Sequence, residues 1–121
     1  IFMGLDRLAD SMSFEHLAAL GESYGSGAIV VFDETSDMEG VVRRIAKFFH
    51  HESCGQCVPC RVGTEVQQEA LERFLDGDGA QRRILEDVDR VMTDASICGL
   101  GRTASSAIRS ALRLGLIGGA T

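Results

Sequence analysis

The chain has 121 residues, of which 12 are Lys or Arg and 18 are Asp or Glu, so its formal net charge is −6, and 45% of its residues are hydrophobic. These values are typical of a globular protein and argue against disorder, and the length suits one domain or a small domain with part of another. The negative balance disfavours nucleic acid as a partner, because phosphates select for clustered Lys and Arg.

The first 35 residues have the pattern of a small α/β unit. Ser13 is expected to cap a short helix that begins at Phe14, and the glycines between residues 21 and 27 are expected to end it and turn the chain. Residues 28–32, Ala-Ile-Val-Val-Phe, are a continuous apolar run typical of a short strand buried on both faces. A lone strand cannot satisfy its own backbone, so we expect it to pair with strands elsewhere in the protein or within residues 1–7.

From Ser36 onward the apolar residues repeat at helical spacing, which predicts a mainly α, four-helix bundle. Four stripes of apolar side chains are expected to face one another. They cover residues 38–49, after a capping box of Ser36 and Glu39; 62–75, ended by Gly77; 84–92, after a cap of Asp78 with Gln81; and 104–112, after a cap at Thr103.

All four cysteines lie in this helical part, as Cys54, Cys57 and Cys60 at three-residue spacing and a remote Cys98. Disulfides are disfavoured by the reducing location expected of this chain and by a length sufficient to form a core. Structural zinc sites usually pair two separated Cys-x-x-Cys knuckles, whereas the split here is three plus one. A thioredoxin-like redox pair would lack its βαβ surroundings and would leave two thiols unexplained.

A [4Fe–4S] cluster fits this spacing best. Each of its four irons has one vacant ligand position, so a Cys-x-x-Cys-x-x-Cys turn can wrap three corners while a remote cysteine takes the fourth. Thiolate is the soft donor that such clusters select. Arg61 and Arg102 flank the two cysteine segments, and their positive charge would offset the negative charge of the cluster.

The run ESCGQCVPCRVGT at residues 52–64, followed by SICGLG at residues 96–101, closely resembles the C-terminal part of the flavin-bearing NADH-dehydrogenase family. This family includes the 51-kDa-type subunit of respiratory complex I, the diaphorase subunit of NAD-reducing hydrogenases and the β-subunit of NAD-dependent formate dehydrogenases. The resemblance implies that residues 1–35 end a ubiquitin-like β-grasp domain and that residues 36–121 form a helical [4Fe–4S]-binding domain. It also implies that Cys54, Cys57, Cys60 and Cys98 ligate the cluster, which relays single electrons between FMN and the next redox centre.

The resemblance also sets what this chain is not expected to do alone. The family binds FMN and NADH in a glycine-rich N-terminal portion that is absent from this sequence, so we expect no NADH oxidation by the chain itself. Expected partners are that N-terminal portion of the same subunit and other iron–sulfur subunits of a multisubunit oxidoreductase. The alternative hypothesis is a zinc-stabilised or metal-free helical domain that docks a partner subunit.

The sequence also bears on location. The longest strongly apolar run, residues 28–32, is far shorter than the about 20 residues that cross a bilayer, so no direct membrane span is expected. No charged-then-apolar signal peptide opens the chain, so we expect a cytoplasmic protein that partner subunits can hold at the cytoplasmic face of a membrane. Because the chain begins with Ile1 instead of Met, we expect it to be part of a longer protein.

Overall fold

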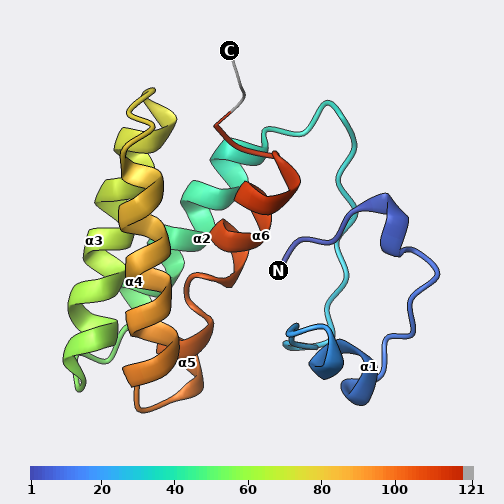
Figure 1. Cartoon of the computed structure of the whole chain (residues 1–121), viewed down its shortest axis with the longest axis horizontal. Helices are drawn as coiled ribbons and strands as arrows, with labels where there is room; N and C mark the ends of the chain where they lie inside the picture. Colours follow the sequence, from blue (N-terminus) through green and yellow to red (C-terminus); the bar gives the residue numbers. More distant parts are fainter. Residues whose placement is uncertain (119–121) are drawn as a thin grey trace.

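The computed structural model describes residues 1–118, which form helices and loops without a strand, so the mainly α prediction is confirmed. Figure 1 shows the helices gathered on one side, with the N-terminal residues and α1 as an irregular arm on the other. The elements are η1 (Leu5–Arg7), α1 (Phe14–Ala19), α2 (Met38–Glu52), α3 (Val58–Leu75), α4 (Gln81–Ala95), α5 (Gly99–Thr103) and α6 (Ser106–Leu114).

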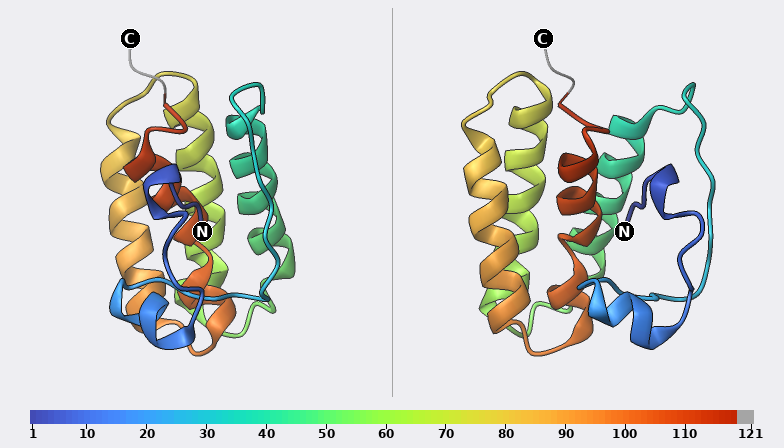
Figure 2. Two further views of the ribbon diagram at one scale, coloured as in Figure 1. Left: turned by 90° about the vertical axis from the view of Figure 1, so that its right-hand side faces the viewer. Right: turned by 45° about the vertical axis from the view of Figure 1, so that its right-hand side comes forward.

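Helices α2, α3, α4 and α6 lie side by side and share one apolar core (Figure 2). Each contributes small or aliphatic side chains to it, since a helix with an apolar stripe must bury that stripe against its neighbours. The buried residues are Val42, Ala46, Ala70, Leu71, Leu85, Ile108, Ala111 and Ile117. Within the described residues, no helix is both long and apolar enough to cross a membrane.

Helices α3 and α4 pack closely against each other near the cysteines. A Cβ added to Gly63 would lie 2.7 Å from Met92 Sδ, so only a glycine at that position lets Met92 pack against the helix backbone. Met92 and Thr64 are both fully buried here. The start of α3 and the end of α4 are therefore held together tightly, and these are the ends that lead into the two cysteine segments.

Some apolar side chains that the helical spacing predicts to be buried are exposed to solvent. Phe48, Val62, Ile84 and Val91 were expected to point inward but are 57%, 45%, 40% and 54% exposed. The stripes are wider than the faces that these helices bury against one another. Val62 and Val91 border the same surface groove between α3 and α4.

The structure corrects several predicted helix starts. Asp37, not Ser36, caps α2 by accepting a hydrogen bond from the Gly40 N–H at 2.9 Å, while the Ser36 hydroxyl turns back to Asp33 at 3.1 Å. Helix α3 begins at Val58, before the predicted residue 62, because a proline in the first turn (Pro59) costs a helix nothing there. Asp78 does bind Gln81, but the residue at the N-cap of α4 is Ala80.

The predicted cap at Thr103 is also wrong. Thr103 ends the short helix α5, and its hydroxyl donates to the carbonyl of Gly99 at 2.8 Å. Helix α6 then starts at Ser106, whose hydroxyl donates to the Thr103 carbonyl at 2.7 Å. The residues after Cys98 therefore form two short helices where one was expected.

The N-terminal arm confirms one prediction and corrects another. Ser13 caps α1 by accepting a hydrogen bond from the His16 N–H at 3.2 Å. Residues 28–32, predicted as a buried strand, form no strand, and Val30 and Val31 are 69% and 89% exposed. A strand needs a neighbouring strand to pair its backbone N–H and C=O groups, and residues 1–118 contain no strand that could pair with this run. The predicted α/β remnant therefore lacks its strand in this structure.

Candidate iron–sulfur site

The four cysteines lie at the beginnings of α3 and α5 or in the loop before α3. Figure 1 shows that α3 and α5 begin at the same end of the group of helices. Cys54 is exposed in the loop between α2 and α3, Cys57 is the half-buried N-cap of α3, and Cys60 is buried in the first turn of α3. Cys98 is exposed and is the N-cap of α5. None of the four is in a disulfide.

Cys57 and the segment of the remote Cys98 meet in space. The backbone N–H groups of Ile97 and then of Cys60 lie beside the Cys57 sulfur and stabilise its thiolate, so they hold the pKa of Cys57 below its ordinary value. Burial opposes this shift, and the positive charge of Arg61 adds a smaller lowering. Cys57 and Ile97, which are 40 positions apart in the sequence, thus lie together, with the Ile97 N–H beside the Cys57 sulfur.

A second contact joins the two segments at Cys60. A Cβ added to Gly101 would overlap the Ser96 hydroxyl and would lie 3.0 Å from Cys60 Cβ, so Gly101 is a glycine because these side chains fill its place. Gly99, in the same helix, has no described atom within 4 Å of its would-be Cβ. Cys60 therefore packs directly against α5, whereas the backbone at Gly99 faces open space beside Cys98.

Cys60 is the best-shielded thiol, with 5% of its surface exposed. Its sulfur lies 3.4 Å from the Ser53 hydroxyl, which also accepts from the Gly55 N–H. Its carbonyl accepts a hydrogen bond from the Thr64 hydroxyl at 2.8 Å. The first turn of α3 is thus fixed on both sides of the cysteine.

The two arginines predicted to flank the site brace its loops. Arg61 Nη1 donates to the Gly55 carbonyl at 3.1 Å, which closes the loop around the left-handed turn at Gly55, where φ is 75°. Arg102 Nε donates to the Ser96 carbonyl at 3.0 Å. Each guanidinium therefore holds the backbone of the cysteine segment next to it, and the charge of Arg61 also acts on the Cys57 thiol.

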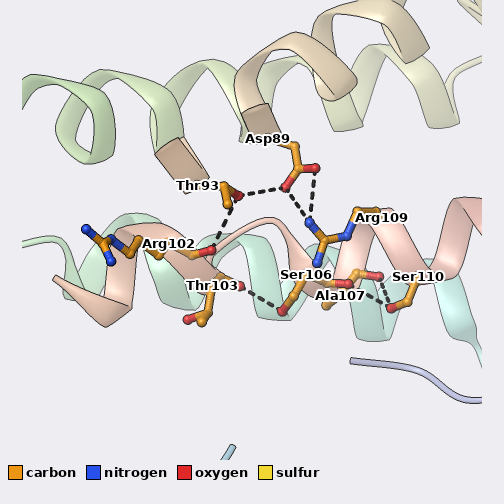
Figure 3. A network of polar contacts seen from close by, with 8 residues as sticks. All are labelled: Asp89, Thr93, Arg102, Thr103, Ser106, Ala107, Arg109 and Ser110. Carbon is orange, nitrogen blue, oxygen red and sulfur yellow. Dashed lines mark hydrogen bonds and ion pairs between the residues drawn. The ribbon is translucent and has the colours of Figure 1, made fainter. Parts of the chain in front are cut away.

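A polar network fixes α5 and α6 against α4 (Figure 3). Asp89 on α4 receives two contacts from Arg109 Nη1, at 3.2 and 3.3 Å, and one from the Thr93 hydroxyl at 3.4 Å. Thr93 lies 3.5 Å from the carbonyl of Arg102. Since Arg102 follows Cys98 by four residues, this network helps set where the remote cysteine segment lies.

The cysteines do not converge on a single point. In the described part of the chain, no three His, Cys, Asp or Glu side chains lie close enough together to hold one metal ion. A four-iron cube takes one thiolate at each iron, so it does not need thiols that point at one centre. His50 and His51 lie in the last turn of α2.

Ser96 is the residue of the site that the sequence did not single out. It lies two positions before Cys98 and is 2% exposed, and its hydroxyl has no hydrogen-bond partner among the described residues. The cysteine spacing draws attention to the sulfur ligands only. The burial of this serine depends on how α4, α5 and the start of α3 pack, which no local pattern reports.

Comparison with known proteins places residues 40–114 in the family described as the NADH-ubiquinone oxidoreductase-F iron–sulfur binding region. The matched residues run from α2 to the end of α6 and include all four cysteines.

Individual proteins similar to this chain are named as subunits of NADH oxidoreductases. The chain is 38% identical over 104 residues to the F-type subunit of the NADH-quinone oxidoreductase of Rickettsia bellii, covering 84% of this chain and 25% of that protein. It is 33% identical to the mitochondrial NADH-ubiquinone oxidoreductase 51 kDa subunit of Neurospora crassa, covering 84% of this chain and 21% of that protein. The chain thus spans about a quarter of the length of these relatives.

A solved structure is also similar. The crystal structure of an NAD+-reducing [NiFe]-hydrogenase in the H2-reduced state matches 69% of this chain and 15% of the hydrogenase chain, with a TM-score of 0.64 and 36% sequence identity. At this identity the likeness extends to sequence as well as fold. The similar proteins are therefore subunits of NADH oxidoreductases and an NAD+-reducing hydrogenase.

Proposed function

The chain belongs to the family of NADH-ubiquinone oxidoreductase-F iron–sulfur binding regions, and from this premise we propose that it carries one [4Fe–4S] cluster on Cys54, Cys57, Cys60 and Cys98. In this proposal the chain is the electron-transfer part of an NADH-dependent flavoprotein subunit. When bound, the cluster supplies one-electron transfer between FMN and the next redox centre.

The observation that carries the proposal is the meeting of the two cysteine segments. The N–H of Ile97, next to Cys98, lies beside the sulfur of Cys57, and Gly101 packs on Cys60. The donor set is four thiols, the soft ligands that iron–sulfur clusters require. The residues present therefore fit the group.

The surrounding chain supplies what a charged cluster needs. Backbone N–H groups and, more weakly, the positive charge of Arg61 stabilise the Cys57 thiolate, while Arg102 holds the backbone at Ser96, two residues before Cys98. The burial of Cys60 keeps water from that corner, whereas Cys54 and Cys98 face the surface. An exposed edge beside a shielded one lets an electron enter or leave without exposing the whole centre to solvent.

We place FMN and NAD outside this chain, in an N-terminal portion of the same subunit, because the chain spans only about a quarter of its relatives. In this proposal residues 1–35 end a β-grasp domain and residues 36–121 form a four-helix bundle that carries the cluster. The exposed run at residues 28–32 supports the first part, since Ile29, Val30 and Val31 would be covered by strands of the preceding portion.

Other iron–sulfur subunits of the same complex are the proposed electron partners, and the protein is proposed to be cytoplasmic. A groove of about 250 Å³ between α3 and α4 supports a docking role. Its lining is almost wholly apolar and includes Val58 and Pro59, which lie between two proposed ligands. A subunit seated there would contact the turn that carries Cys57 and Cys60.

This groove also favours the second candidate, a zinc-stabilised or metal-free docking domain. The two candidates differ in what the cysteines hold. A cubane needs all four thiolates, so Cys98→Ala is expected to reduce bound iron as severely as Cys57→Ala after anaerobic reconstitution with iron and sulfide. Full iron binding by the Cys98→Ala chain would remove Cys98 from the ligand set.

The same preparations test whether FMN and NAD bind in another part of the subunit. The reconstituted chain is expected to reduce no artificial acceptor with NADH above the background without protein. Steady NADH oxidation by the chain would contradict a flavin site placed in another part of the subunit.

A further inference from the structure

Ser96 carries a buried hydroxyl without a hydrogen-bond partner. Its backbone is fully used, because its N–H donates to the Met92 carbonyl at 3.2 Å and its carbonyl accepts from Arg102 Nε at 3.0 Å. Its side-chain oxygen, by contrast, has lost its water and has no partner among residues 1–118. Burying a hydroxyl unpaired opposes folding, so an acceptor brought within reach of this hydroxyl would be favoured.

The missing acceptor can be located from its neighbours. The Ser96 hydroxyl and Cys60 Cβ both border the small space that a Cβ on Gly101 would occupy. Cys60 is the most buried of the four thiols, and its own sulfur contacts Ser53 on another side at 3.4 Å. Ser96 thus lies beside Cys60, at the corner of the site where water is excluded, and the sulfur nearest to this corner is that of a proposed ligand.

We propose that, when the cluster is bound, the Ser96 hydroxyl donates a hydrogen bond to the Cys60 sulfur. This bond would raise the reduction potential of the cluster. This inference rests on the proposed function, since it requires the cluster to be present. A donor stabilises the reduced cluster more than the oxidised one, because reduction adds negative charge to the sulfur atoms. Low surrounding polarity strengthens the effect.

The neighbouring Ser53 differs from Ser96 in a way that the experiment can use. Ser53 is half-buried and already contacts both the Cys60 sulfur and the Gly55 N–H. Its hydroxyl has alternative partners, including solvent, so its removal is expected to shift the potential less than removal of the Ser96 hydroxyl does. Ser105 provides the matched control, because it is 4% exposed with an equally unpartnered hydroxyl and lies at the groove between α4 and α6 instead of at the thiols.

The test compares the reconstituted 121-residue chain with its Ser96→Ala and Ser105→Ala variants in redox titrations followed by electron paramagnetic resonance. Ser96→Ala is expected to lower the equilibrium constant for one-electron reduction about three- to tenfold, a midpoint lower by about 30 to 60 mV. Ser105→Ala is expected to leave the midpoint unchanged. An unshifted midpoint in Ser96→Ala would overturn the proposal, and equal shifts in both variants would overturn it too, because they would show a general effect of losing a buried hydroxyl.

A spectroscopic readout separates a direct bond from a change in packing. After exchange into deuterated water, electron–nuclear double resonance on the reduced chain is expected to show one exchangeable deuteron coupled to the cluster that Ser96→Ala lacks. The same deuteron in the variant would contradict the proposal. Iron content distinguishes the two levels of failure, since a chain that binds no iron refutes the proposed function, whereas a loaded Ser96→Ala chain with unchanged potential refutes only this inference.

Discussion

Substituting Gly101 by alanine tests whether α5 packs on Cys60 as the structure shows. The new Cβ would overlap the Ser96 hydroxyl and would lie 3.0 Å from Cys60 Cβ. These neighbours are a buried serine and the start of a helix, so they cannot rotate away as the end of a long side chain could. We therefore expect Gly101→Ala to separate the Cys98 segment from Cys60.

The magnitude follows from two opposing effects. Overpacking a well-filled site costs about 1–3 kcal/mol, and replacing a helical glycine by alanine returns up to about 1 kcal/mol. The expected net loss is about 1–2 kcal/mol, which for a chain of this size lowers Tm by about 4–8 °C. Because the displaced atoms adjoin a proposed ligand, bound iron is expected to fall as well.

Gly99→Ala is the matched control, since Gly99 lies in the same short helix and its would-be Cβ meets no described atom within 4 Å. It is expected to leave Tm unchanged or slightly raised. The assay is thermal unfolding by circular dichroism, with iron content measured on the same reconstituted samples. A Gly101→Ala chain that matches Gly99→Ala in both Tm and iron would refute the close packing of α5 on Cys60.

Three further predictions concern capping, the core and the thiol. Asp37→Ala is expected to destabilise α2 by about 1 kcal/mol because it removes the N-cap acceptor, while Ser36→Ala is expected to change Tm little. Leu71→Ala removes a fully buried core side chain and is expected to cost about 2–5 kcal/mol in urea unfolding, whereas Val91→Ala, at a half-exposed position, is expected to cost much less. In a cluster-free chain whose other cysteines are serine, Cys57 is expected to react with iodoacetamide with a midpoint pH below 9.0, because N–H groups favour its thiolate.

The sign of that last effect extends to stability. A thiol whose pKa is lower in the folded state stabilises the fold at pH values above its unfolded pKa, and this contribution is lost as the pH falls through the folded pKa. The cluster-free chain is therefore expected to gain stability as the pH rises toward 9.0.

Each of these three predictions has a result that would contradict it. Equal losses of stability in Asp37→Ala and Ser36→Ala would contradict the cap at Asp37, and a small loss in Leu71→Ala would contradict the burial of Leu71. Reaction of Cys57 with an unshifted midpoint pH would contradict the N–H contacts to its sulfur.

The sequence predicted the parts of this protein that depend on local spacing. Apolar residues at helical intervals located α2, α3, α4 and α6, and the three-plus-one cysteine pattern, with the motifs around it, pointed to the family that the comparisons identify. The predicted cap of α2 was wrong by one residue because Ser36 and Asp37 are both good N-cap residues, and the choice depends on the contacts of Asp33 with the Ser36 hydroxyl.

What the sequence could not provide depends on distant partners. Residues 28–32 have the composition of a strand, but a strand requires a second strand, and the described residues contain none. Val62 and Val91 share the spacing of core residues, yet both remain open at a groove. The burial of Ser96 and the close approach of Gly101 to Cys60 depend on how α3, α4 and α5 pack together. The spacing of residues within one helix therefore cannot predict them.

The central claim is that this chain holds one [4Fe–4S] cluster, and the most direct measurement is its metal and sulfide content after anaerobic purification and reconstitution. We expect about four irons and about four inorganic sulfides per chain, with a broad brown absorbance. About one zinc per chain with no iron, bound by the same cysteines, would contradict the claim and would favour a zinc-stabilised docking domain.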